Sequence, residues 1–362
     1  MAIKHLEEYR DAGISNRLMD NIRAAGKTGV RLMEVCGTHT VAIFRSGIRS
    51  LLPENISLLS GPGCPVCVTA QGEIDAFIET AKKEDVIITT FGDLLRVPGT
   101  SSSLQQARAD GADIRIVYSA IDALELARQT TDKTIVFLGV GFETTAPTIA
   151  ATIAMARQTG VGNFVVFSAH KLVPPALEAL ASAETVRVDG FLLPGHVSVI
   201  IGVNAYRSFF EKYQIPSVVA GFEPVDILQG VETLVAAIAG GSPALGNVYT
   251  RAVTDAGNIK AQKRLSEVFA PTDARWRGLG IIPGSGLQIA EAYQMFDAQV
   301  RYDIKIADAP EPKGCACGEI LTGTKTPPEC SLYKKVCTPM APVGPCMVSS
   351  EGTCAAYYRY HV

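Results

Sequence analysis

The sequence predicts an α/β protein with two similar parallel-sheet domains and a cysteine-rich domain at its C-terminus. Its 362 residues exceed the size at which a single hydrophobic core usually stops growing. Short apolar, β-branched runs alternate with helical segments through the middle of the chain. The nine cysteines fall into two clusters, three within the first 67 residues and six after residue 314. A core filler would be scattered more evenly, so the clusters indicate chemistry.

The strands follow one plan that occurs twice. Strands are expected at 31–35, 56–60, 86–90 and 114–119, and again at 134–140, 164–169, 190–195 and 217–221. Helical periodicity separates them, as in 73–83. This alternation is typical of Rossmann-like parallel sheets. It predicts a first domain at 28–130 and a second at 131–242, joined near 128–133. Residues 1–27 and 243–362 would form a helical and cysteine-rich domain.

Charge and hydropathy exclude several classes of partner. The formal net charge is -3, with 33 basic residues against 36 acidic ones, so we expect neither nucleic acid nor an anionic membrane surface as partner. The N-terminal segment MAIKHLEEYRDAG lacks an apolar signal core, and no apolar run approaches the length of a spanning helix. We therefore expect a cytoplasmic protein whose cysteines stay reduced unless they bind metal or do redox chemistry.

Polar side chains follow the predicted strands at the sheet end where parallel sheets bind ligands. In the first half these are Cys36 with His39, the GPGCPVC segment and Asp93; in the second half they are Glu143, His170, His196 and Glu223. Three of the five histidines lie at these positions. Polar loops are common, but the whole set together indicates an active site.

Cys36 and His39 are spaced so that thiol and imidazole can face one point at a helix start. The helix N-terminus favours a thiolate, which suits nucleophilic chemistry or a soft transition metal. A buried cysteine followed by a capping histidine is the structural alternative.

Cys64 and Cys67 have the spacing of redox pairs and also of half a zinc site. No second close pair lies near them in the chain, and Pro65 with the preceding glycines holds a tight turn at a helix start. This pattern favours a reversible disulfide.

The segment GVGFETT, at 139–145, follows a strand and opens a helix, so it could bind a phosphate through backbone N–H groups. It matches neither of the common nucleotide motifs in full. ATP is a candidate ligand on this basis, and tight turn packing is the alternative.

The C-terminal segment carries six cysteines among prolines and glycines, with little apolar material for a core. Six thiols exceed one tetrahedral ion, and no histidine lies among them. An iron–sulfur cluster is therefore favoured over zinc, although a zinc ribbon is also compatible with the pattern.

Seven motifs together resemble the HypD family of [NiFe]-hydrogenase maturation factors. They are EVCGTHT, GPGCPVC, GFETTAPT, LPGHVSVIIG, GFEPVDIL, IIPGSG and the spaced cysteines of the C-terminal segment. The resemblance covers essentially the whole chain. It implies a scaffold for assembly of the Fe(CN)2CO group, which works with a HypC-like chaperone and a HypE-like cyanide donor and serves the hydrogenase large subunit indirectly.

The resemblance also implies roles for all nine cysteines. Cys36 would hold the iron with His39 beside it, and Cys64 and Cys67 would be a redox pair near that site. The C-terminal segment is similar to the cluster environment of ferredoxin:thioredoxin reductase, which implies a [4Fe-4S] cluster and a nearby disulfide. The implied cluster ligands are Cys315, Cys330, Cys337 and Cys354, and the implied pair is Cys317 with Cys346.

Two residues enter the site by position alone, namely His196 and Glu143, which we expect to complete the cleft between the two domains. The resemblance describes an assembly scaffold with redox-active thiols and leaves open whether it is an enzyme. Two other functions use the same residues: an iron–sulfur-dependent dithiol oxidoreductase that needs no Cys36, and a zinc-stabilised nucleotide-binding module.

Overall fold

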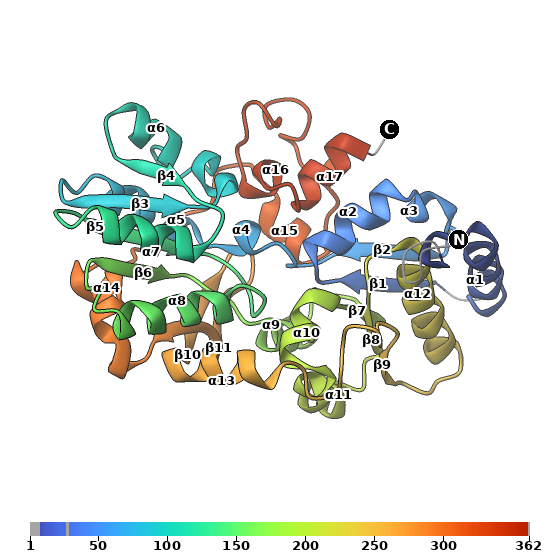
Figure 1. Cartoon of the computed structure of the whole chain (residues 1–362). Helices are drawn as coiled ribbons and strands as arrows, with labels where there is room; N and C mark the ends of the chain where they lie inside the picture. The colour runs from blue at the N-terminus through green and yellow to red at the C-terminus, as the bar shows by residue number, and fades with distance from the viewer. Residues whose placement is uncertain (1–7, 27–28, 361–362) are drawn as a thin grey trace.

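Two parallel β-sheets form the core of the molecule (Figure 1). The computed structural model describes residues 8–26 and 29–360. The first sheet has five strands in the order β2-β1-β7-β8-β9, and the second has four in the order β4-β3-β5-β6. The predicted fold class, two parallel-sheet units with a cysteine-rich C-terminal region, is confirmed.

The strands lie close to their predicted positions. Those of the first sheet are β1 (Val30–Glu34), β2 (Ile56–Ser60), β7 (Gly190–Pro194), β8 (Ser217–Ala220) and β9 (Leu245–Asn247). Those of the second are β3 (Val86–Thr90), β4 (Ile114–Ile116), β5 (Thr134–Gly139) and β6 (Phe164–Ser168). Two differences stand out: β9 was not predicted, and β4 ends three residues early because the chain turns out to Tyr118, which is 93% exposed.

The pairing of the strands does not follow the predicted domain boundary near residue 130. β3 pairs with β5 directly across it, with Val86 opposite Thr134. β1 pairs with β7 of the other half, with Leu32 opposite Gly190. The second sheet is thus one continuous segment, and the first sheet is built from chain on both sides of it. Buried strands of a parallel sheet are apolar whichever neighbour they pair with, so their pattern carries no information on partners.

The helices cover both faces of the sheets. After the first two strands come α2 (Gly37–Arg45), α3 (Ile48–Leu51), α4 (Pro65–Val68) and α5 (Gln71–Ala81). The second sheet is covered by α6 (Leu104–Ala109), α7 (Ala120–Gln129) and α8 (Ala146–Gln158). The chain returns to the first sheet through α9 (Val173–Ser182), α10 (Gly195–Ile201), α11 (Arg207–Tyr213) and α12 (Pro224–Ala239).

Local sequence sets where these helices begin. Ser119 and Asp122 form a capping box at α7, in which each side chain accepts from the backbone N–H of the other residue. Proline stands in the first turn of α4, α8, α9 and α12, where its missing N–H costs nothing.

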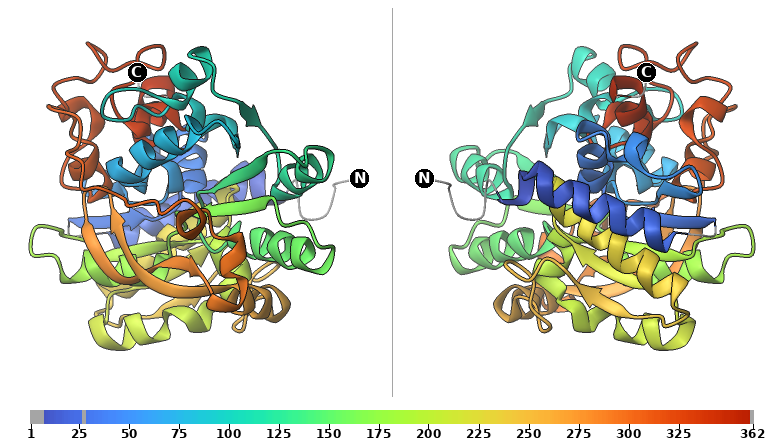
Figure 2. Two further views of the ribbon diagram at one scale, coloured as in Figure 1. Left: turned by 90° about the vertical axis from the view of Figure 1, so that its left-hand side faces the viewer. Right: turned by 90° about the vertical axis from the view of Figure 1, so that its right-hand side faces the viewer.

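The first helix, α1 (Ala12–Ala25), packs on α12 and belongs with the first sheet (Figure 2). The expectation that residues 1–27 join the cysteine-rich domain is therefore wrong for the part of them that the structure describes. Met19 and Ile22 of α1 are buried in one core with Leu32, Leu192 and other residues of the first sheet. The apolar face of the helix explains this placement, because it needs a large core to cover it.

An antiparallel hairpin links the two sheets. It consists of β10 (Phe269–Trp276) and β11 (Gly280–Ile289) and follows α13 (Ile259–Val268). Phe269 and Leu287 pack in the core of the second sheet. Trp276, at the far end of β10, packs instead with residues of the first sheet and the C-terminal segment.

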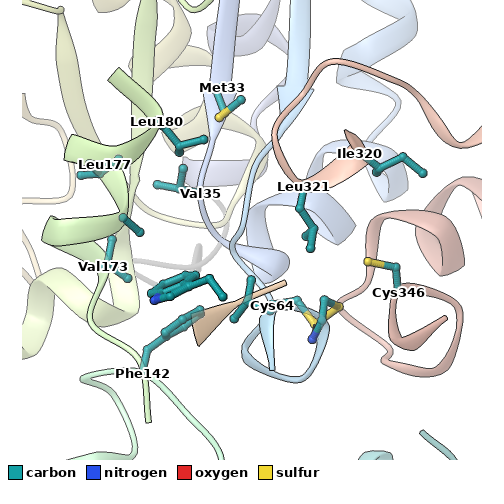
Figure 3. Packing of buried hydrophobic residues seen from close by; sticks show 14 of the residues in the cluster. Met33, Val35, Cys64, Phe142, Val173, Leu177, Leu180, Ile320, Leu321 and Cys346 are labelled. Carbon is teal, nitrogen blue, oxygen red and sulfur yellow. A yellow bond between two sulfur atoms is a disulfide. The ribbon is translucent and has the colours of Figure 1, made fainter. Parts of the chain in front are cut away.

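The C-terminal segment lies over the carboxyl ends of the first sheet's strands. It contains the short helices α15 (Cys317–Leu321) and α16 (Pro345–Val348) and ends in α17 (Thr353–Tyr360), whereas α14 (Ala298–Arg301), which precedes it, packs on β6 of the second sheet. Figure 3 shows Ile320, Leu321 and Cys346 of this segment beside Met33 and Cys64. α16 packs on α4, and α17 packs on α2. The cysteine-rich segment thus shares a core with the sheet rather than forming one of its own.

Five short 3-10 helices complete the described elements. They are η1 (Glu8–Arg10), η2 (Gly92–Arg96), η3 (Val203–Tyr206), η4 (Glu291–Phe296) and η5 (Pro327–Glu329). Within the described ranges, no helix is both long enough and apolar enough to cross a membrane.

Candidate functional site

Cys36 and the GPGCPVC loop lie side by side at the carboxyl ends of β1 and β2. Cys36 is the residue before the first turn of α2, and Gly37 N–H donates to Gly63 O at 2.9 Å. A Cβ on Gly63 would lie 2.2 Å from the Cys36 nitrogen, closer than real Cβ atoms approach any backbone atom. Glycine is therefore required at position 63, and the two motifs form one site.

Cys36 is buried, at 8% exposure, with its thiol at the helix start. Burial raises the pKa of Cys36 to about 12, although the backbone N–H groups of His39 and Thr38 lower it. The N–H groups at the helix start do favour the thiolate, as expected, but the cost of desolvating its charge is larger, so burial favours the neutral thiol. A metal cation could supply the missing positive charge.

Glu34 supports Cys36 from below, and sequence reasoning missed it. Its carboxyl group accepts from Cys36 N–H at 3.1 Å and from the Thr40 hydroxyl at 2.5 Å. Burial raises the pKa of Glu34 to about 8. An acidic residue within a strand whose neighbours are apolar was the available signal.

His39 is completely buried beside Cys36. Its Nε2 lies 2.9 Å from Gly221 O, and since a carbonyl only accepts, Nε2 carries the hydrogen. Nδ1 then carries a lone pair and is buried without a hydrogen-bond partner. Burial lowers the pKa of His39 to about 4, so the ring is neutral.

His196 and His39 both pack against the ring of Phe222. The His196 and Phe222 rings stack with centroids 4.0 Å apart, and the His39 centroid is 4.9 Å from that of Phe222. His196 is exposed, and partial burial lowers its pKa while Glu351 opposes this. The structure therefore brings His39 and His196 together, but both come from the first sheet and not from opposite domains.

Glu143 comes from the second sheet and is buried at 3% exposure. Its Oε1 accepts from Val173 N–H at 2.9 Å, and its Oε2 is buried without a partner. Burial raises the pKa of Glu143 to about 7. Its only described hydrogen-bond partner outside its own residue is Val173, so no described hydrogen bond joins it to Cys36 or His39.

The GVGFETT loop is packed rather than open. Residues 139–143 are buried, and Phe142 stacks on Trp276 with ring centroids 6.0 Å apart. A Cβ on Gly141 would overlap the side chain of Thr145. Tight turn packing, the alternative to a phosphate site, accounts for these glycines.

Cys64 and Cys67 are joined in a disulfide, with their Cα atoms 5.2 Å apart. Cys64 precedes α4, and its sulfur also accepts from Cys67 N–H at 3.2 Å. Both residues are buried, Cys67 completely. The predicted pairing of these two cysteines is thus present, and it lies beneath the C-terminal segment.

All six C-terminal cysteines surround one small cavity, which we call the cysteine chamber. Cys317 and Cys346 face each other, with their sulfurs 2.9 Å apart and not bonded. The other four, Cys315, Cys330, Cys337 and Cys354, line the same space together with Leu332, Tyr333 and Met347. Within the described residues, no three His, Cys, Asp or Glu side chains converge closely enough to hold a single ion. The thiols therefore enclose a space instead of meeting at a point.

The electrostatics of the chamber favour a positively charged occupant. Burial, followed by the neighbouring cysteines, raises the pKa of Cys354 well above its usual value. Several thiols in one apolar space cannot ionise together unless a cation joins them. An iron–sulfur group with thiolate ligands fits this all-sulfur donor set.

A polar groove of about 540 Å³ runs past the mouth of the Cys36 site. Thr38 of α2 donates to Glu351 of the C-terminal segment at 2.7 Å in its wall. Arg10 forms an ion pair with Glu223 in the same groove at 2.6 Å. Glu351 was not predicted, and its place beside Cys36 depends entirely on how the C-terminal segment folds back.

The remaining predicted polar residues have structural partners. Asp93 accepts from the Ser349 hydroxyl and the Ser350 N–H, each at 3.2 Å, and so ties the C-terminal segment to the second sheet. His170 lies against Ser168, whose hydroxyl is 3.0 Å from Nδ1. Neither contacts the Cys36 site.

These features define a class: a two-sheet α/β protein with a single buried thiol, an adjacent buried disulfide and a chamber of six further cysteines. The family model of HypD, described as Hydrogenase formation hypA family, matches residues 13–361. The chain belongs to the HypD family of hydrogenase maturation factors.

Three relatives named Hydrogenase maturation factor HypD illustrate the similarity. The protein of Azotobacter vinelandii is 46% identical, over 99% of this chain and 97% of its own length. That of Cupriavidus necator is 45% identical over the same shares. That of Escherichia coli K12 is 44% identical, over 99% of this chain and 98% of its own.

Proposed function

We propose that this protein is a redox-active scaffold on which the Fe(CN)2CO group of [NiFe] hydrogenase is assembled. It would act with a HypC-like chaperone and a HypE-like cyanide donor before transfer of the group to the hydrogenase large subunit. The observation that carries this proposal is the hydrogen bond from Gly37 N–H to Gly63 O, which holds the single thiol of Cys36 beside the Cys64–Cys67 disulfide. Seven of the nine cysteines are free, which supports a reducing compartment such as the cytoplasm.

Cys36 is the residue that would hold the iron substrate. A soft thiolate suits low-spin iron with strong-field cyanide and carbonyl ligands. Because burial keeps the free thiol neutral, ionisation would accompany the arrival of the metal cation. Cys36 thus gives up its proton to gain a metal bond, and the N–H groups of Thr38 and His39 stabilise the resulting negative charge.

His39 and His196 would order the space beside the iron. The hydrogen bond to Gly221 O fixes the His39 ring, so its neutral Nδ1 can accept a hydrogen bond from an incoming group. His196 stands at the exposed side of Phe222, where a partner can reach it. Glu143 lies deeper, and we assign it a supporting role.

The cysteine chamber would hold a [4Fe-4S] cluster through Cys315, Cys330, Cys337 and Cys354. Such a group supplies one-electron redox chemistry when bound. The chain itself contributes two dithiols, each of which gives up two electrons and two protons when its disulfide forms. The sulfurs of Cys317 and Cys346 are already 2.9 Å apart, and α16, which carries Cys346, packs on α4 with Cys67.

Infrared spectroscopy tests this proposal directly. The protein would be purified without oxygen together with its HypC-like and HypE-like partners, as wild type and as Cys36→Ala. We expect cyanide and carbonyl stretching bands in the wild type and none in the variant. Cys64→Ser serves as a second variant, because it breaks the dithiol but leaves the Cys36 thiol in place.

A dithiol oxidoreductase is the second candidate, and the observed disulfide favours it. Its burial opposes it, since exchange requires an attacking thiolate to reach a sulfur atom and Cys67 has no exposed surface. If wild-type protein with an intact cluster showed no infrared bands but reduced disulfides of other proteins, the oxidoreductase would be the better assignment.

A further inference from the structure

Arg277 occupies the tip of the β10–β11 hairpin and is buried at 2% exposure. Its backbone N–H donates to Val68 O at 2.9 Å, and its Nε donates to Thr69 O at 3.2 Å. Val68 and Thr69 directly follow Cys67. The side chain therefore packs against the segment that follows α4, the helix that contains Cys67.

Arg277 is a buried cation without a carboxylate partner. Lys171 is the other buried cation among residues 8–26 and 29–360, and its Nζ lies 2.7 Å from Glu73. For Arg277 the described contacts are two carbonyl or amide oxygens, from Thr69 and Gln71, and its Nη1 is buried with no hydrogen-bond partner. Burying a guanidinium group without a counter-charge is costly, so a negative charge is expected close to it in some state of the protein.

The neighbour that can supply this charge is the cysteine chamber. A Cβ on Gly278 would lie 2.4 Å from the Cα of Gly318, so the hairpin tip touches the backbone next to Cys317. The chamber is lined by thiols and apolar side chains, with no acidic residue. Glu311 binds Gly278 N–H at 3.0 Å, but it is exposed and forms no ion pair with Arg277.

Electrostatics agree with this geometry. Arg277 lies close enough to the chamber for its charge to act on the side chains of Cys315, Cys317 and Cys346. The positive charge thus favours negative charge in the chamber.

We infer that Arg277 is a positioning residue whose charge balances the anionic cysteine chamber, and that the same side chain links the chamber to the segment after Cys67. This inference rests on the proposed function, in which the chamber holds an iron–sulfur group through thiolates. It assigns the fixed positive charge that such a group needs when it takes up an electron in a buried, apolar space.

The test is a redox titration of the full-length protein, purified without oxygen, with dithionite as the electron donor. The paramagnetic reduced state is followed by electron paramagnetic resonance in the wild type, Arg277→Gln, Arg277→Lys and Lys171→Gln. Iron and sulfide contents and melting curves are measured on the same samples. Lys171→Gln is the matched control, because it removes a buried cation that has its own carboxylate.

We expect Arg277→Gln to lower the midpoint potential by about 59 mV, which is a tenfold change in a one-electron equilibrium. Losing one buried unit charge at an effective dielectric constant of about 20 has an effect of this order. Arg277→Lys should keep the wild-type potential, and Lys171→Gln should keep it even if it melts earlier.

An unchanged potential in Arg277→Gln, with a full iron content, would overturn the inference. Should that variant not fold, Arg277→Lys decides. A wild-type potential there supports a role of charge, whereas loss of iron with a normal melting curve would show that only the shape of arginine matters. Wild-type protein without iron and sulfide would instead reject the proposed cofactor, before any variant is compared.

Discussion

Replacing Glu143 by Gln should flatten the pH dependence of stability. The carboxyl group is 3% exposed, one oxygen accepts from Val173 N–H at 2.9 Å, and the other has no partner. Burial raises its pKa from 4.5 to about 7. Glutamine keeps the size and the accepting oxygen, so the substitution removes the ionisable proton and little else.

The sign follows from proton linkage. A carboxyl group with a higher pKa in the folded state binds its proton more tightly when folded, so folding is favoured at low pH. Its contribution is complete below about pH 4.5 and is lost as the pH rises through about 7. The interval between the two pKa values corresponds to about 3 kcal/mol. The stability of Glu143→Gln relative to wild type should therefore increase by about 3 kcal/mol between pH 5 and pH 8.

Urea unfolding at several pH values across this range measures the difference, because changes shared by wild type and variant cancel. Glu178→Gln is a suitable control, since it removes a carboxylate from the surface, where solvent screens it. A difference between wild type and Glu143→Gln that stays constant from pH 5 to pH 8 would refute the account of Glu143.

Three further predictions concern the site and its cover. Gly63→Ala should lower the free energy of unfolding in urea by about 2 kcal/mol or more, because its Cβ would lie 2.2 Å from a backbone atom. The control Gly162→Ala, whose Cβ would have no atom within 4 Å, should change it by less than about 0.5 kcal/mol. Equal effects of the two substitutions would contradict the close contact of Gly63 with Cys36. Asp93→Ala should speed up amide hydrogen exchange in residues 345–360, because the local free energy of opening falls by about 1–2 kcal/mol when the contacts with Ser349 and Ser350 are lost. Unchanged exchange there would show that these two contacts do not hold the segment. Removing bound iron with a chelator should make residues 315–354 sensitive to proteases while the sheets stay folded, and unchanged cleavage would show that the chamber is held by packing alone.

The strand positions were predictable because they depend on local composition. The runs at 56–60 and 86–90 are apolar and β-branched and coincide with β2 and β3. Which strands pair was not predictable, since β3 and β5 are both completely buried and would look the same beside any neighbour. The hairpin at 269–289 was missed because it combines a buried edge with polar residues and a turn of glycines.

The candidate site divides in the same way. The spacing of Cys64 and Cys67 determines that they can bond, because only two residues separate them at a helix start. Cys317 and Cys346, which are 29 residues apart, meet only because α15 and α16 fold around one chamber. The helix start at Cys36 was predictable, but its neutral thiol was not, since desolvation depends on the chain that covers it.

The sequence by itself determined the fold class, the strand positions, the local cysteine pair and the motifs that identify the family. These follow from short-range spacing, which the chain carries wherever it folds. Only the tertiary structure decided which strands share a sheet, how the C-terminal segment closes over Cys36, and where Glu34, Glu351 and Arg277 lie. The physical reason is that burial and contact between distant segments set both the pKa values and the neighbours of these side chains, and a linear pattern records neither.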